Sequence, residues 1–286
     1  MTATSVPAAG IAATGTGAAE PRPRFRDLVA AEWVKLRSLR STWIAYGATA
    51  LAVIAINAGT AYDTYSHWSQ QGAEGAAAFV RDGIPLQTAF TANATIVMAL
   101  ALATIGSLAI IGEYSTGTIR TTFAAVPARR SVMAAKVVVV AAVTTAFGAL
   151  VAGISFGLTQ AILDGRGVGI SIGDPGALSV VAASTLLAPV CALAGLALGT
   201  VIRQTATTMI VAVMVILVLP IVFSDDRHWS AVAGHALPYQ AWLRLVAADP
   251  APTAFPWTTG GAWTVYAVWA LAAAVLTVIS VHRRDQ

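Results

Sequence analysis

The sequence predicts an all-α polytopic membrane protein with six transmembrane helices, and two observations support this prediction. Only 10% of the 286 residues are charged, whereas a soluble domain has about 25%. The charges also leave long uncharged stretches, at 41–62, 83–112, 137–163, 175–202, 204–224 and 250–282. A helix needs about 20 apolar residues to cross a bilayer core, so each stretch can supply one span. With 57% hydrophobic residues, the chain is also too apolar to be disordered.

Each span is placed inside one uncharged stretch, and the lack of period-two alternation favours helices over barrel strands. The expected spans are 42–62, 89–112, 137–163, 178–202, 206–223 and 262–281. Residues 42–286 should therefore form a single membrane domain. Residues 1–24 are rich in Ala, Thr and Gly and are expected to be a disordered cytoplasmic tail.

The basic residues predict the orientation of these spans. Thirteen of the 17 Lys and Arg residues fall on the side of the two termini, and four fall on the other side: Arg81, Arg166, Arg227 and Arg244. The positive-inside rule then makes both termini cytoplasmic, in a multi-pass protein of the inner (cytoplasmic) membrane. Because the basic residues flank spans and form no groove, the net charge of +4 does not indicate nucleic-acid binding.

Residues 25–41 form a helix candidate that is too short and too charged to span. Apolar side chains recur along it with the spacing of one helical face, at Phe25, Leu28, Val29, Trp33 and Leu36. A basic amphipathic helix before a first span is expected to lie in the cytoplasmic interface. The alternative is an ordinary basic anchor beside the membrane.

Residues 224–261, on the outer side, are too hydrophobic for a free loop. They contain Trp229, Tyr239 and Trp242, with Pro238 as an interruption. Because Trp and Tyr favour the membrane interface, one or two short outer-face helices are expected before the last span.

The spans contain few groups that could do chemistry. None has an Asp, Glu, Lys or Arg inside it, which argues against proton or ion coupling. The two lysines, Lys35 and Lys136, fit no phosphate-binding loop. His228 and His235 match no standard metal spacing. We therefore expect no catalytic residue, cofactor or metal in this chain, and any energy for uphill transport must come from a partner.

The loop between the second and third spans has the features of a docking element. Glu113 ends an uncharged stretch, Gly117 permits a bend, and nearby hydroxyl groups can cap a short helix. The capping candidates are Ser115, Thr116 and Thr118. Arg129, Arg130 and Lys136 can bind anionic headgroups or an acidic protein groove. On composition alone, an ordinary polar loop with positive-inside charges is the favoured interpretation.

Two segments resemble the membrane permease of type-2 ATP-binding-cassette (ABC) exporters. Residues 32–41 match the family's E-x-x-K-x-x-[ST]-x-R-S entry into the first span. Residues 112–118 match its G-E-x-x-x-G-T motif, and the P-x-[SR]-R segment at 127–130 and Lys136 follow. A weaker match is Leu237-Pro238 before the last span.

The resemblance implies a partner arrangement. Such a permease pairs with a second copy of itself or a related permease in membrane lipid, and with a dimer of cytosolic ABC ATPase subunits that hold ATP-Mg. It also implies that the loop after the second span couples to the ATPase through Glu113, Gly117, Thr118, Arg120, Arg129, Arg130 and Lys136. The elbow helix would contribute Glu32, Lys35 and Arg37.

Two other functions remain open from the residues alone. One is a membrane anchor or sensor that binds a cytosolic partner, and the other is a secondary carrier without an ATPase. Gly153-x-x-x-Gly157 and Gly195-x-x-x-Gly199 allow close helix contact in either case. Asn57 can face a pathway or hydrogen-bond between helices.

Overall fold

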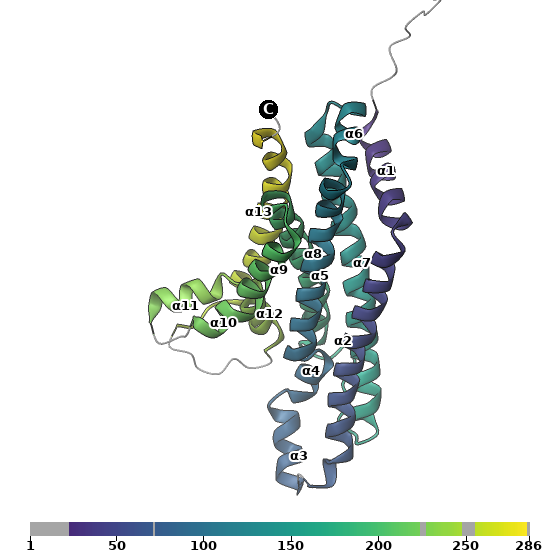
Figure 1. Cartoon of the computed structure of the whole chain (residues 1–286). Helices are drawn as coiled ribbons and strands as arrows, with labels where there is room; N and C mark the ends of the chain where they lie inside the picture. The colour runs from purple at the N-terminus through teal and green to yellow at the C-terminus, as the bar shows by residue number, and fades with distance from the viewer. Residues whose placement is uncertain (1–22, 71, 224–226, 248–254, 285–286) are drawn as a thin grey trace, which may run out of the picture.

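Long helices run along the molecule in a computed structural model (Figure 1), and its described residues contain no strand. The description covers residues 23–70, 72–223, 227–247 and 255–284. The expected tail falls almost wholly outside them, so its disorder stays a prediction. The other elements can be compared directly with the sequence.

Among the described residues, six helical segments are long and apolar enough to cross a membrane, which confirms the expected six-helix membrane fold. They are Arg40–Ser66 (α2), Ile84–Ser115 (α4 and α5), Arg129–Asp164 (α7), Ala177–Ile202 (α8), Thr205–Val222 (α9, η2 and α10) and Thr259–Ser280 (in α13). Each overlaps its expected range, and the largest difference is at the third segment, which begins at Arg129 where 137 was expected. The agreement follows because the uncharged stretches are local features of the sequence.

Shorter elements precede or connect the spans. They are α1 (Phe25–Ser38), η1 (Trp68–Gln70), α3 (Gly72–Arg81), α6 (Thr118–Ala125), α11 (His228–His235) and α12 (Pro238–Val246). The last two confirm the expected short helices before the final span. The second span consists of α4 (Ile84–Ala89) and α5 (Ala92–Ser115), and this division was not expected.

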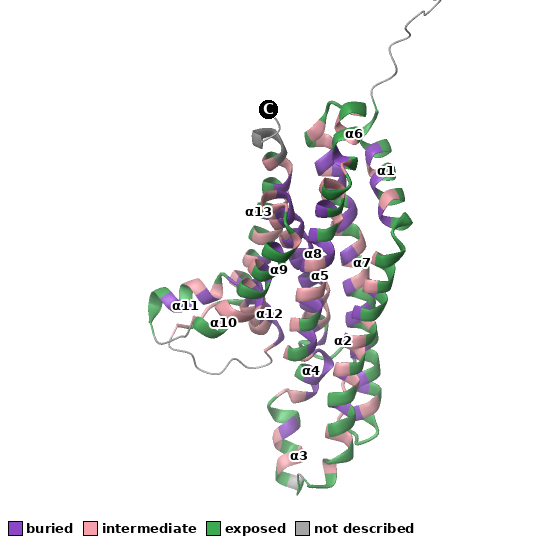
Figure 2. Cartoon of the chain, in the orientation of Figure 1, coloured by how far each residue is buried: buried purple, intermediate pink, exposed green. Residues whose placement is uncertain are grey.

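Helix α8 lies at the centre of the bundle, against α5, α7, α12 and α13. Buried residues gather on α5 and α8 in Figure 2. Gly106 and Gly195 allow these two helices to approach, because a Cβ at either position would overlap a carbonyl oxygen of the facing helix. Gly199 also faces α5, so the Gly195–Gly199 pair serves an internal contact. Gly153 and Gly157 have open space around them.

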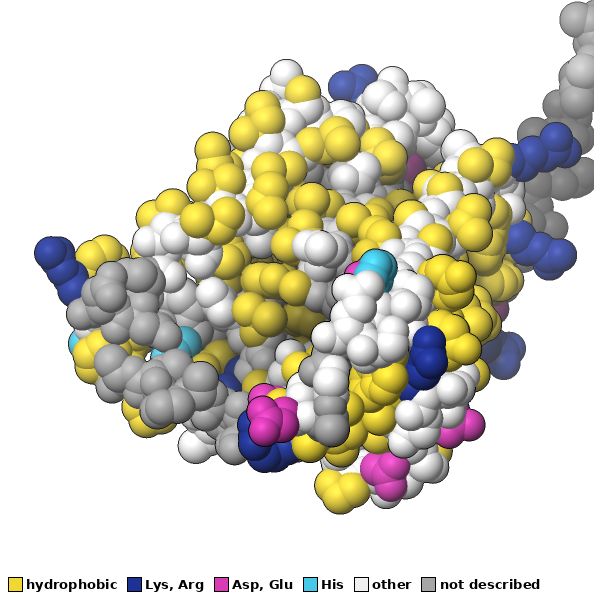
Figure 3. Space-filling view, turned by 90° about the horizontal axis from the view of Figure 1, so that it is seen from below, with side chains coloured by type: hydrophobic (Ala, Val, Ile, Leu, Met, Phe, Trp, Pro, Cys, Tyr) yellow, Lys and Arg dark blue, Asp and Glu magenta, His cyan; other side chains and the backbone are white. Residues whose placement is uncertain are grey.

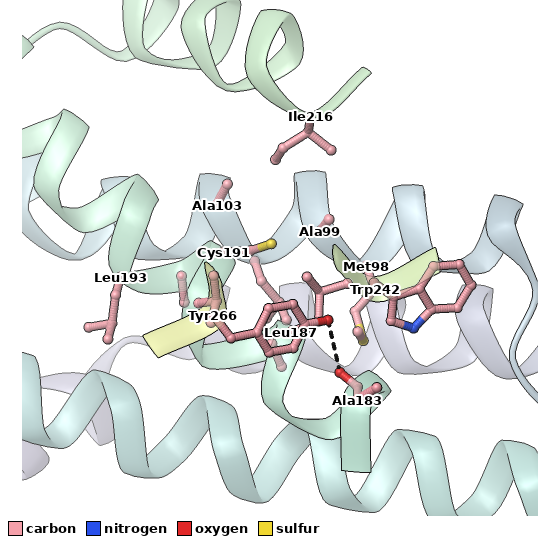
Figure 4. Packing of buried hydrophobic residues seen from close by; sticks show 14 of the residues in the cluster. Met98, Ala99, Ala103, Ala183, Leu187, Cys191, Leu193, Ile216, Trp242 and Tyr266 are labelled. Carbon is pink, nitrogen blue, oxygen red and sulfur yellow. Dashed lines mark hydrogen bonds between the residues drawn. The ribbon is translucent and has the colours of Figure 1, made fainter. Parts of the chain in front are cut away.

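The rest of the core is apolar, with a few satisfied polar groups. Figure 4 shows Leu187, Cys191 and Tyr266 packed together, with the Tyr266 hydroxyl donating to the Ala183 carbonyl oxygen. Trp242 of α12 is 1% exposed and donates through its ring nitrogen to Ser184 Oγ. These contacts attach α12 and α13 to the central helix.

The fifth span is irregular where the sequence places Pro220. Helix α9 (Thr205–Val213) passes into a π-helical turn at Met214–Val218 and then into α10 (Leu219–Val222). Proline has no backbone N–H to continue the α-helical ladder, which accounts for the change of hydrogen-bond pattern. Pro189, in contrast, is accommodated within a continuous α8.

Helix α7 has 36 residues, or about 54 Å, which exceeds a bilayer core of about 30 Å. It therefore extends beyond its apolar middle, and its first turns contact α1. In Figure 1, α1, α6 and the marked C-terminus lie at one end of the molecule, while α3 lies at the other. Figure 3 views the α3 end, where acidic and basic side chains are scattered among hydrophobic and other side chains.

Candidate functional site

The loop expected to couple to a partner forms a helical hairpin at the α6 end. Helix α5 ends at Ser115, and Gly117 has φ of +73° just before α6 begins at Thr118. This left-handed conformation suits glycine because it has no Cβ. Two of the hydroxyl groups expected to cap a short helix lie at the end of α5 instead. The hydroxyls of Ser115 and Thr116 both donate to the Gly112 carbonyl oxygen. They close the end of α5, and α6 has no side-chain cap.

One face of helix α6 packs against the bundle, and the other face is exposed. Ile119 is 5% exposed and belongs to the main core. Arg120 and Thr121 are exposed, so the outer face of α6 is available for contact. After Pro127, α7 begins at Arg129, whose guanidinium lies 5.4 Å from the centre of the Phe123 ring.

Helix α1 packs against the first turns of α7. Its buried residues are Leu28, Glu32 and Leu36, and Leu28 contacts Val132 and Ala135. Phe25 and Trp33 are 48% and 41% exposed, so they do not pack into the bundle. The face that enters the bundle instead includes a carboxylate. Figure 1 shows α1 running beside α7 toward α2, and its interfacial position in a membrane stays a prediction.

Four charged side chains from three helices meet at this end, and we call them the charge cluster: Glu32, Lys35, Glu113 and Lys136. Lys136 Nζ lies 2.5 Å from Glu32 Oε2 and 2.9 Å from Glu113 Oε1. Lys35 Nζ lies 2.7 Å from Glu32 Oε1 and 3.3 Å from Glu113 Oε1. Each ammonium group thus binds both carboxylates, and the cluster joins α1, α5 and α7.

The two carboxylates and two ammonium groups of the charge cluster stabilise one another. The side chains of Glu32 and Lys136 are only 5% and 6% exposed, so neither charge would be stable there alone. Burial raises the pKa of Glu32, but the charges and hydrogen bonds of Lys136 and Lys35 outweigh it and leave this pKa below its usual value. Burial lowers the pKa of Lys35, but Glu32 and Glu113 outweigh it and leave this pKa raised. Glu32 and Lys35 are therefore both held in their charged forms near neutral pH.

The structure brings together only some of the residues that the resemblance singled out. Glu32, Lys35, Glu113 and Lys136 converge, although they are separated by as many as 104 positions. Arg37, Arg120 and Arg130 are exposed outside the cluster. Gly117 and Thr118 form the turn into α6. Contact of any of these residues with an ATPase stays a prediction.

Two residues of this end were not recognised from the sequence. Arg203 follows α8, has φ of +58°, and places its guanidinium 4.3 Å from the centre of the Tyr114 ring. Tyr114 directly follows Glu113, so this contact adds α8 to the elements that meet there. The available signal was that Arg203 is the one charge between the uncharged stretches 175–202 and 204–224.

A cavity of about 550 Å³ lies beside the charge cluster, between α1, α2, α5 and α7. Across the residues that the structure describes, no group of three or more His, Cys, Asp or Glu side chains is arranged to hold a metal ion. Binding capacity at this end therefore comes from the open face of α6, the charge cluster and the cavity.

A family model described as "ABC-2 family transporter protein" matches residues 28–220, which include most of α1, the charge cluster and α6. No curated protein matches the chain.

Proposed function

The chain belongs to the ABC-2 family of transporter proteins, and we propose that it is the permease subunit of an exporter driven by a separate cytosolic ATPase. Membership makes it a multi-pass membrane protein of ABC-type transport. Proteins of this family usually work with a cytosolic ATPase. The proposal adds the direction of transport, the path through the bundle and the contact with the ATPase.

The observation that supports this proposal is the position of α6 above the charge cluster. The outer face of α6 is exposed, while Glu113 lies four residues before Gly117 and binds lysines of α1 and α7. A displacement of α6 by a partner would reach three helices through buried ion pairs. Buried packed groups transmit such shifts because they switch between discrete arrangements.

The proposal assigns the nucleotide chemistry to the partner. Two ATPase subunits bind and hydrolyse ATP-Mg in the cytosol, and this chain contributes no catalytic residue. Two permease subunits, identical or related, enclose the pathway within membrane lipid. The α6 end with both termini faces the cytoplasm, as the distribution of basic residues predicts.

Gly117→Trp tests the coupling step, and Gly167→Trp is its matched control. Both glycines have positive φ, +73° and +69°, and both have open space where a Cβ would lie. Gly117 adjoins α6, whereas Gly167 lies in the loop after α7 at the other end of the chain's third span. Backbone strain is therefore similar, and only the contact surface differs.

The measurement is ATP hydrolysis and transport in proteoliposomes that contain the permease and the ATPase that copurifies with it. Gly117→Trp should lower permease-stimulated ATP hydrolysis about tenfold, and Gly167→Trp should retain it. Equal activity of the two variants would reject α6 as the coupling element. Failure to copurify any ATPase, with transport intact, would favour a secondary carrier. Binding of a partner without transport would favour an anchor or sensor.

A further inference from the structure

The cavity beside the charge cluster combines an apolar wall with a polar end. Its apolar lining comes from four helices and includes Leu36, Tyr46, Ile105, Leu108 and Val140. Its volume of about 550 Å³ is within the range of small-molecule sites, roughly 300–1,000 Å³. Leu108 is 47% exposed, so the cavity reaches the surface of the bundle at this residue. This shape suits a molecule with an apolar tail and a compact polar head.

The hydrogen bonds of the charge cluster leave one oxygen without a donor. Glu32 uses Oε1 for Lys35 and Oε2 for Lys136. Glu113 receives both lysines at Oε1, and no described residue donates to its Oε2. This atom is not among the fully buried polar atoms that lack a partner, so it borders open space. Glu113 also lines the cavity, which places an unused carboxylate oxygen at its polar end.

Two hydroxyl groups add to this polar end. Ser41 and Thr42 line the cavity at the start of α2. A hydroxyl can both accept and donate, so each can complete the hydrogen bonds of a bound head group. The two lysines offer much less, because each ammonium is already bound by both carboxylates. An anionic head would have to compete with these carboxylates, and the Glu32–Lys136 pair is buried and costly to disturb.

We propose that this cavity binds a cationic amphiphile, with a primary ammonium head at Glu113 Oε2 and the hydroxyls of Ser41 and Thr42, and with its tail along Leu108 and Ile105. The ammonium supplies the donors that the open oxygen needs, and its hydrogen bond to the carboxylate is charge-assisted. The inference deepens the proposed function by naming a substrate class. Binding itself needs neither ATP nor a partner, so it can be tested separately.

The test measures saturable binding of radiolabelled dodecylamine to the full chain in nanodiscs, with the partition into empty nanodiscs subtracted. Wild-type protein should bind one dodecylamine per cavity. Glu113→Gln should weaken binding about tenfold or more, because it removes the charged acceptor. Excess dodecyl phosphate should not compete at concentrations where unlabelled dodecylamine does.

A second variant keeps the test decisive if Glu113→Gln disturbs the charge cluster. Leu108→Trp fills the cavity from its open side without touching a charge and should abolish saturable binding. Leu271→Trp is the matched control, because Leu271 is an exposed span leucine of α13 outside the cavity. Unchanged binding in Leu108→Trp, no saturable binding in wild type, or equal competition by dodecyl phosphate would overturn the proposal.

The outcomes also separate this proposal from the proposed function. Saturable binding without any ATPase-driven transport would reject the exporter role and keep the site. ATPase stimulation through α6 without dodecylamine binding would keep the exporter role and reject the site.

Discussion

The two ends of α5 are attached to neighbouring helices by different chemistry, to α2 and α7 at one end and to α1 and α7 at the other. Thr91 and Glu113 mark these ends, 22 positions apart in the sequence, or about 33 Å along a helix. At the first end, Asn57 of α2 accepts from Thr91 N and Oγ1, both at 2.9 Å, and donates to Ser155 Oγ of α7 at 3.1 Å. At the other end, Glu113 joins α1 and α7 through ion pairs.

This difference predicts that the Asn57 end stays fixed and that the Glu113 end responds to changes in charge. We call Asn57, Thr91 and Ser155 the amide hub; it contains no titrating group, so salt and moderate pH do not change it. The charge cluster depends on four charges that balance one another, and a partner, ligand or proton that shifts one of them alters the other three. The end with the charge cluster is also the end with α6. A fixed amide hub can then serve as the pivot for movement at the charge cluster.

The largest effect is expected from Lys136→Met, which leaves Glu32 buried with one partner instead of two. The free energy of unfolding should fall by about 3 kcal/mol or more, as for other broken buried pairs. SDS-induced unfolding in mixed micelles measures the loss. Arg130→Met is the control, because Arg130 is exposed on the same helix and its loss should cost less than about 0.5 kcal/mol. Similar losses in both variants would show that the cluster does not stabilise the bundle.

Asn57→Leu should have the next largest effect, and it tests the other end. It removes three hydrogen bonds and leaves the part-buried Thr91, which caps α5, and the buried Ser155 of α7 without this partner. The expected loss is about 2 kcal/mol, independent of salt concentration. Asn93→Leu is the control, since Asn93 is exposed in the first turn of α5. A salt-dependent loss in Asn57→Leu would contradict the division into a neutral and a charged end.

The spans and the charge cluster differ in how well the sequence predicts them. The spans follow from charge depletion, which any short window of the sequence reveals. The charge cluster depends on which helices are neighbours, and Lys35 and Glu113 are 78 positions apart. The resemblance singled out all four residues but assigned them to a partner. Glu32 was the hardest to foresee, because it occupies the buried face of α1 between Leu28 and Leu36.

Acidification should weaken the contacts of the charge cluster and leave those of the amide hub unchanged. The pKa of Glu32 is below its usual value of 4.5 in the folded protein, so its stabilising effect is complete above pH 4.5 and is lost as the pH falls through the folded pKa. Lys35 has a raised pKa, so its effect is present below 10.5 and is lost only in strong alkali. The change should be smaller than in Lys136→Met, since a protonated Glu32 is neutral and can still hydrogen-bond.

Spin labels can compare the ends directly. Labels at Arg37→Cys and Arg130→Cys report the charged end, and labels at Tyr62→Cys and Asn93→Cys report the amide hub; all four positions are exposed. The native Cys191 is buried, which protects it from labelling. The distance distribution of the first pair should broaden below pH 4.5, and that of the second should not. Parallel broadening would mean that acid unfolds the whole bundle.

The smallest change in the free energy of unfolding is expected from substitutions of Arg203. They test a contact beside the charge cluster. The ring contact of Arg203 with Tyr114 should be worth about 0.5–1 kcal/mol, while its φ of +58° costs a non-glycine residue about 1 kcal/mol. Arg203→Ala keeps the strain and loses the contact, so it should destabilise by about 1 kcal/mol. Arg203→Gly loses the contact but relieves the strain, and its unfolding free energy should stay close to wild type. If Arg203→Gly is the less stable of the two, the αL backbone at this position carries no strain that glycine relieves.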